Sequence, residues 1–147
     1  MKKLILICGL LASGFSFGAN WTYVTSSNLE SFYIDKDFYK YDVKNKTVDV
    51  WSKSEKKKIY LDEFYTSSKS LSRYSCINKQ AKTLAYINYN EDGIAIKSST
   101  KPEGEFSLIF PDSIGDGMWE VACRSKGKGF VFPEYRPELV PFENIPK

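Results

Sequence analysis

The sequence contains no histidine, and this absence limits the chemistry that it can support. Histidine activates serine and cysteine nucleophiles, binds most catalytic zinc ions and is the usual acid or base near neutral pH. A phosphate-binding P-loop, a GxGxxG motif and a CxxC pair are also missing. We therefore expect a protein that is not an enzyme and that holds no cofactor and no metal ion.

Long apolar runs are missing too, because no stretch after residue 19 has the roughly eighteen consecutive apolar residues that a membrane helix needs. At the start of the chain, Lys2 and Lys3 precede a short apolar run at 4–12, and small residues then occupy positions that signal peptidase reads, with the expected cut near Ala19. This order is typical of a bacterial secretory signal peptide, and the short apolar core disfavours the alternative of a retained anchor. We expect residues 1–19 to be removed and the exported chain to have no transmembrane span.

Cysteine is scarce, with three in the chain, and Cys8 lies inside the expected signal peptide. Export then leaves Cys76 and Cys123 as the only pair in an oxidising compartment, so we expect a disulfide between them. Closing a loop of about 47 residues destabilises the unfolded chain by roughly 4 kcal/mol in the chain-entropy model. That is a large contribution for a small domain.

Charge of one sign is not in large excess. The chain has 21 basic and 18 acidic residues, and two of the basic residues leave with the signal peptide. A nearly neutral mature chain gives no electrostatic reason to expect nucleic acid as a partner. Its length suits a single domain, which we place at residues 20–124, followed by a tail at 125–147 that is rich in proline and aromatic residues.

Strand patterns dominate the mature chain. Apolar and polar residues alternate at 48–53, and several other short segments are aromatic or β-branched. These further candidate strands are 21–24, 31–34, 71–78, 83–89, 94–97 and 106–110. Turn residues around Asn45, Asn78 and Asn90 separate some of them. Short successive strands joined by tight turns predict an antiparallel meander.

One helix is predicted near the end of the domain. Residues 111–113 offer an N-cap, and the apolar residues that follow share one helical face. These apolar residues are Ile114, Met118, Val121 and Ala122. The expected fold is therefore α+β and mainly β, with one C-terminal helix packed on the sheet and linked by the disulfide to a strand. Asp112, Asp116 and Glu120 follow one another at helical spacing, and we expect them to form a solvated face rather than a metal site.

The tail has a different character, because Pro133, Pro137 and Pro141 recur every fourth residue among aromatic residues. Such a segment is neither a regular helix nor a central strand. We expect it to lie extended, either against its own domain or against a partner.

The densest charge cluster follows a predicted strand, at 53–58, and aromatic residues flank it. Lysines beside aromatic rings could bind a sulfated glycan or an acidic protein segment. The alternative is a hairpin tip that only improves solubility. The candidate ligand-binding residues are Trp51, Lys53, Lys56, Lys57, Lys58 and Tyr60.

Several motifs follow one another in a particular order over most of the mature chain. They are Trp21, Tyr33-Ile34-Asp35, Val48-Asp49-Val50-Trp51, residues 69–76, the strand at 84–89, and residues 111–115 leading to Cys123. In this order they resemble the surface-adhesin protein E family of Gram-negative bacteria. The resemblance implies an antiparallel sheet with a packed helix and bonded cysteines. In some members it implies surface exposure and binding to host extracellular-matrix proteins and epithelial cells, and it admits a homodimer.

Two functions are compatible with these features. The first is an exported, non-enzymatic surface adhesin that engages epithelial cells or host extracellular-matrix glycoproteins of the vitronectin or laminin type, or sulfated glycans. The alternative is a periplasmic structural or inhibitory protein that binds another envelope protein. The expected location is accordingly the periplasm, the outer membrane or the cell surface of a Gram-negative bacterium.

Overall fold

The computed structural model describes residues 18–57 and 65–133. In chain order the elements are β1 (Trp21–Ser26), β2 (Glu30–Asp42), β3 (Thr47–Lys56), β4 (Ser67–Ser75), β5 (Gln80–Tyr89), β6 (Ala95–Ser99), β7 (Glu103–Leu108) and α1 (Ile114–Cys123). Every strand pair is antiparallel. The predicted α+β fold with a C-terminal helix is confirmed. No helix within the described ranges is long and apolar enough to cross a membrane.

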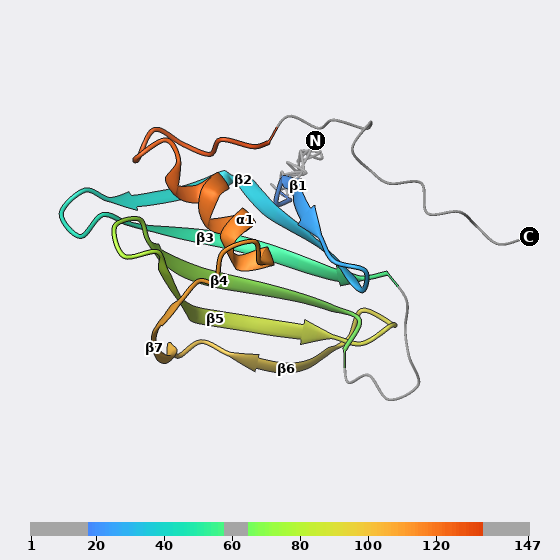
Figure 1. Cartoon of the computed structure of the whole chain (residues 1–147). Coiled ribbons are helices and arrows are strands. Elements are labelled where there is room, and N and C mark those ends of the chain that lie inside the picture. The colour runs from blue at the N-terminus through green and yellow to red at the C-terminus, as the bar shows by residue number, and fades with distance from the viewer. Residues whose placement is uncertain (1–17, 58–64, 134–147) are drawn as a thin grey trace, which may run out of the picture.

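The first six strands lie side by side in chain order, as the meander prediction requires (Figure 1). The last strand does not continue the meander, because β7 pairs with β5 instead of lying outside β6. β6 pairs with the end of β5 at Tyr86–Tyr89, whereas β7 pairs with its beginning, from Gln80 to Thr83. β6 and β7 are thus two halves of one interrupted edge strand. Pro102 lies in the interruption, where a residue without an N–H costs no ladder bond.

The core lies between α1 and one face of the sheet. Ile34, Val48 and Val50 are fully buried on the sheet side. Met118, Val121 and Ala122 come from the predicted apolar face of the helix and are buried against them, and Ile114 is partly buried. Figure 1 shows the helix crossing this face at the β1 to β4 side of the sheet.

Both ends of the helix are fixed by specific contacts. Ser113 is the N-cap, and its hydroxyl accepts a bond of 3.2 Å from the backbone N–H of Asp116. At the other end the predicted disulfide is confirmed, joining Cys123 to Cys76, which directly follows β4. The indole N–H of Trp119 also donates to the Ser75 carbonyl at 2.9 Å. Two adjacent links therefore attach the helix to the end of β4.

The first part of the tail folds back onto the domain. The N–H of Val131 donates to the Val121 carbonyl at 3.1 Å. The Phe130 ring contacts Tyr39 edge to face, with 4.8 Å between centroids, and Phe132 packs beside Phe130. Up to residue 133 the tail thus takes the first of the two expected arrangements. The expected signal peptide up to residue 17 and the tail from 134 onward lie outside the described residues.

Candidate functional site

The face of the sheet opposite α1 carries the candidate site, and we call it the helix-free face. Side chains alternate along a strand. Val48 and Val50 point toward the helix, so Asp49, Trp51 and Lys53 of β3 point to the helix-free face. No helix among the described residues covers this side.

Lys53 lies on an aromatic surface within this face. Its ammonium nitrogen is 4.7 Å from the centroid of the Tyr33 ring and 5.6 Å from that of Trp21. The same nitrogen is 2.8 Å from a carboxylate oxygen of Glu55. The Lys53 side chain is only 18% exposed. A cation over an aromatic ring contributes about 0.5–1 kcal/mol at exposed sites and more where it is desolvated, so the rings hold the charge in place. Tyr23 extends the aromatic surface, because its ring meets Tyr33 edge to face at 5.9 Å.

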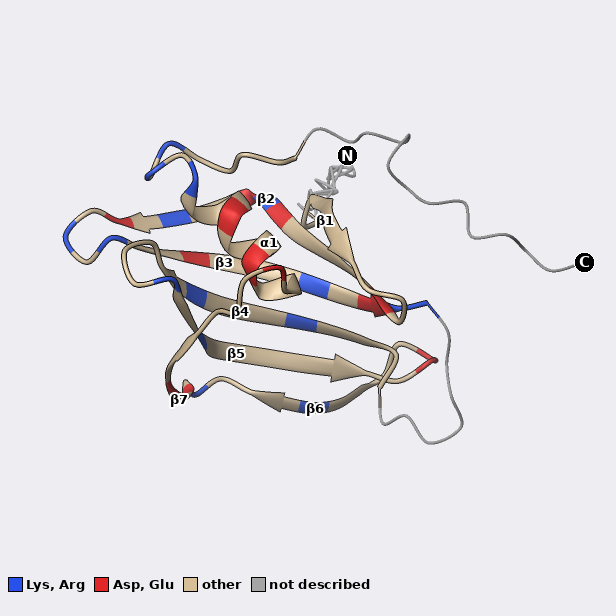
Figure 2. Ribbon diagram, in the orientation of Figure 1, with Lys and Arg blue, Asp and Glu red and all other residues tan. Residues whose placement is uncertain are grey.

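A second lysine lies directly across from the first. Lys69 of β4 is the register partner of Lys53 of β3, and its ammonium group lies 5.2 Å from the Tyr89 ring centroid. Figure 2 shows basic positions on these two neighbouring strands. Like charges placed directly opposite one another destabilise a sheet. An acidic ligand over this pair would relieve that repulsion.

The remaining strong charge pair on the face is engaged within the protein. Arg73 donates two hydrogen bonds to the Asp49 carboxylate, at 2.6 and 2.8 Å, and Asp49 is only 7% exposed. Hydrogen bonding to Asp49 raises the pKa of Arg73 above its usual value. This bidentate pair satisfies a buried carboxylate. The positive charge offered to a ligand therefore comes from the lysines.

The lysines of the 53–58 cluster do not all lie on one side of the sheet. Trp51 and Lys53 share the helix-free face, whereas the alternation directs Lys56 to the other side, where its ammonium group lies 4.4 Å from the Tyr65 ring centroid. Lys57 donates to the backbone carbonyl of Ser27 at 2.6 Å. The two remaining predicted residues, Lys58 and Tyr60, lie outside the described residues.

Sequence reasoning missed Lys69 and the rings of Trp21, Tyr33 and Tyr89. Each lies far along the chain from the charge cluster, and only the register of β1 to β5 brings them together. The predicted strand begins at residue 71, and only the structure extends β4 back to Ser67 so that it includes Lys69.

The acidic helix residues also behave differently from the expected solvated face. A carboxylate oxygen of Asp116 lies 2.7 Å from the ammonium nitrogen of Lys79, and the side chain is 17% exposed. The hydrogen bond from Lys79 lowers the pKa of this carboxyl group, and the backbone N–H of Asp112 contributes. Asp116 thus fastens the start of α1 to the turn between β4 and β5.

The described residues thus form a sheet with a disulfide-linked helix over part of one face, and with aromatic and basic side chains on the other face. The model of the family described as surface-adhesin protein E matches residues 21–124. The chain belongs to this family, as its motif order predicted, and the family is one of surface adhesins of Gram-negative bacteria. In fold the chain is similar to the solved structure titled "The structure of Haemophilus influenzae protein E", with a TM-score of 0.53 and 17% identity over 76% of this chain and 89% of that one. A search of the curated proteins gives no match.

Proposed function

We propose that the protein is a non-enzymatic adhesin that uses the helix-free face to bind sulfated glycans or acidic segments of host extracellular-matrix glycoproteins. One observation carries this proposal: Lys53 and Lys69 are register partners, and each holds its ammonium group over an aromatic ring. Membership of a surface-adhesin family supports the same class of function.

The chemistry of the pair suits a ligand with repeated negative groups. An ammonium group donates strong, charge-assisted hydrogen bonds to sulfate or carboxylate oxygens. Two such groups on adjacent strands can contact neighbouring acidic groups of one ligand. The rings of Trp21, Tyr33 and Tyr89 add apolar surface against which a sugar ring or a peptide backbone can pack.

The lysines beyond β3 extend the proposed surface. Lys57 reaches the turn between β1 and β2, which adjoins the helix-free face at the same end of the sheet. Lys56, Lys58 and Tyr60 stay in the proposal as contacts for a long ligand that continues past this end. Vitronectin and laminin are the host glycoproteins that we expect, and the homodimer stays a prediction.

Bacteria that carry the gene provide the test of this function. Intact cells should adhere to immobilised vitronectin or laminin, and a strain with Lys53→Glu and Lys69→Glu should adhere less. External protease should cleave the protein on intact cells. Protection from protease together with unchanged adherence would contradict the proposal and favour the periplasmic envelope protein.

A control strain separates the effect of the two positions from the effect of the changed net charge. Lys101→Glu with Lys128→Glu changes the net charge by the same amount at two exposed lysines outside the strands, one between β6 and β7 and one after α1. This control strain should adhere like the wild type.

A further inference from the structure

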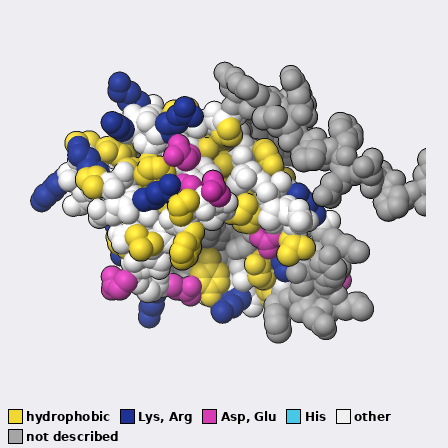
Figure 3. Space-filling view, in the orientation of Figure 1, with side chains coloured by type: hydrophobic (Ala, Val, Ile, Leu, Met, Phe, Trp, Pro, Cys, Tyr) yellow, Lys and Arg dark blue, Asp and Glu magenta, His cyan; other side chains and the backbone are white. Residues whose placement is uncertain are grey.

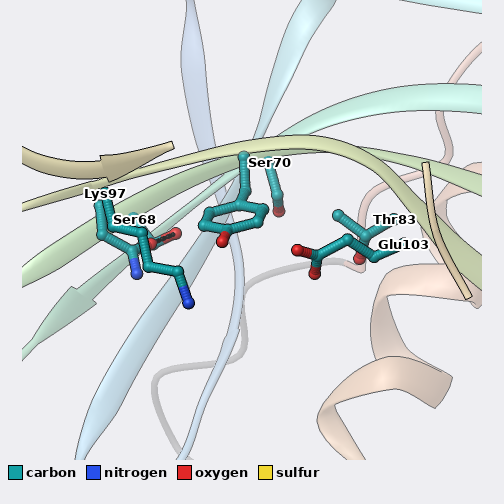
Figure 4. A pocket seen from close by; sticks show the side chains of 7 residues that line it. Ser68, Ser70, Thr83, Lys97 and Glu103 are labelled. Carbon is teal, nitrogen blue, oxygen red and sulfur yellow. Dashed lines mark hydrogen bonds between the residues drawn. The ribbon is translucent and has the colours of Figure 1, made fainter. Parts of the chain in front are cut away.

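The helix covers only part of its own face of the sheet, and the rest carries a polar trough. α1 packs on β1, β3 and β4, while β5 and β6 extend beyond it (Figure 1). There the side chains line a shallow depression, open to solvent, of about 340 Å³. Figure 4 shows the labelled residues on the same side of the sheet, with Lys97 and Ser68 at one end, Thr83 and Glu103 at the other, and Ser70 between them.

The trough exists because β5 is irregular at this point. Thr83 and Tyr86 are three residues apart, so a regular strand would direct them to opposite faces. The register with β4 slips here, since adjacent Leu71 and Ser72 pair with Ala85 and Thr83, which leaves Leu84 as an extra residue. This bulge brings Thr83 and Tyr86 to the same side, where both line the cavity. Bulges commonly redirect side chains beside binding sites.

The neighbouring edge strand is interrupted at the same level. β6 ends at Ser99 opposite Tyr86, and β7 begins at Glu103 opposite Thr83. Both irregularities remove regular ladder pairing, and both occur beside the trough. Regular strands would make a more continuous sheet, so the stability of the sheet does not account for either feature.

Hydrogen bonds orient the polar groups of the trough. The Ser68 hydroxyl donates to the Asn88 amide oxygen at 2.8 Å, which directs the amide nitrogen away as a donor. The Ser70 hydroxyl is 3.0 Å from that of Ser52. The Lys97 ammonium group, which lies 5.8 Å from the Tyr86 ring centroid, supplies donors, and Glu103 supplies acceptors. The lining thus offers both kinds of hydrogen-bonding group around one aromatic ring.

We propose that this trough binds a sugar ring, namely a hexopyranose unit of a glycan. Small-molecule sites usually have volumes of about 300–1,000 Å³ and are mostly apolar. This one has a suitable size but a polar lining, which favours a ligand rich in hydroxyl groups. Sugar hydroxyls both donate and accept, as the lining requires, and the apolar face of the pyranose can lie on Tyr86. Glu103 disfavours a phosphate or a sulfate as the ligand.

The trough opens on the helix side, where apolar and charged side chains are interspersed (Figure 3). It is therefore separate from the helix-free face, and this inference does not depend on the proposed function. The two sites would recognise different chemistry, neutral sugar on one side and acidic groups on the other.

A glycan array probed with the purified protein tests the proposal, followed by NMR titration with the sugar of the retained glycan. We expect capture of a non-sulfated glycan, with amide shifts confined to β4 to β7. Lys97→Ala and Glu103→Gln, both at exposed positions, should each weaken binding about tenfold, the loss expected for one charged hydrogen bond. Tyr86→Ala should abolish binding, and Tyr86→Phe should retain it because the ring remains.

Two controls separate this site from the helix-free face. Lys101→Ala removes a neighbouring exposed lysine that does not line the cavity, and it should bind like the wild type. Lys53→Glu with Lys69→Glu should leave capture of the neutral glycan unchanged. Retention of no glycan, retention of sulfated glycans alone, or equal binding by the Lys97, Glu103 and Tyr86 variants would each overturn the inference.

Discussion

Lys53 and Lys69 are direct partners across β3 and β4, and the rings of Tyr33 and Tyr89 lie beneath their ammonium groups. A cross-strand pair of opposite charge or of β-branched residues would contribute about 0.2–1 kcal/mol, whereas like charges destabilise. The ion pair with Glu55 offsets part of the cost for Lys53, although exposed pairs contribute little. The two like charges therefore do not stabilise the sheet, which supports our proposal that an acidic ligand binds over them.

Breaking the disulfide should lower the free energy of unfolding by roughly 4 kcal/mol, because Cys76 and Cys123 close a loop of 47 residues. Chemical denaturation of the oxidised and reduced protein measures this difference. The Cys76→Ser, Cys123→Ser variant should match the reduced protein and should not respond to reductant. Equal stability of the oxidised and reduced forms would contradict the link between helix and β4.

Much of the fold follows from the sequence because its signals are local. Ser113 caps the helix through its own first turn, and the apolar spacing from Ile114 to Ala122 defines the buried face. The disulfide followed from the cysteine count and the signal peptide. Strand positions were predicted, but β2 is much longer than the predicted 31–34, because its continuation to Asp42 depends on pairing with β3.

The two proposed binding surfaces are harder to predict because they depend on register. A run of lysines is contiguous in the sequence, but alternation sends Lys53 and Lys56 to opposite sides of β3. The trough requires the extra residue Leu84 and the return of β7 to β5. Both arise from contacts between distant parts of the chain, which no local pattern reveals.

Replacing Arg73 by leucine should destabilise the protein by about 2 kcal/mol, because it leaves the buried Asp49 carboxylate without its partner. The double variant Asp49→Asn, Arg73→Leu should recover part of this loss, since it removes the unpaired charge. Urea denaturation of both variants measures the effect. If the single and double variants were equally stable, the pair would be only a surface contact.

Alkaline pH should unfold the protein partly through Tyr74. Burial raises the pKa of this phenol from 10.0 to about 12, so the folded state holds its proton more tightly than the unfolded chain does. The corresponding stability is fully present below pH 10 and is lost as the pH rises toward 12. Tyr74→Phe should show a shallower fall in stability over this range in pH-dependent denaturation. An unchanged slope would mean that Tyr74 ionises without unfolding.

Acid should weaken the ion pair between Asp116 and Lys79, which attaches the start of α1 to the turn between β4 and β5. The hydrogen bond from Lys79 lowers the folded-state pKa of Asp116 below the usual 3.8. The contribution of the ion pair is therefore complete above that pH and disappears as the pH falls through the lower folded value. Asp116→Asn should make stability less sensitive to acid in this range. A variant whose acid transition coincides with that of the wild type would show that the pair contributes nothing.

Titration of the purified protein with a heparin oligosaccharide tests the central claim most directly. The wild type should bind, and its affinity should fall as salt rises, because the Debye length shrinks from about 10 Å at 0.1 M toward 3 Å at 1 M ionic strength. Lys53→Glu with Lys69→Glu should weaken binding about a hundredfold, or tenfold for each lost contact. The matched variant, Lys101→Glu with Lys128→Glu, should bind nearly as well as the wild type. Equal loss in both variants, or no loss in either, would contradict the assignment of ligand binding to the helix-free face.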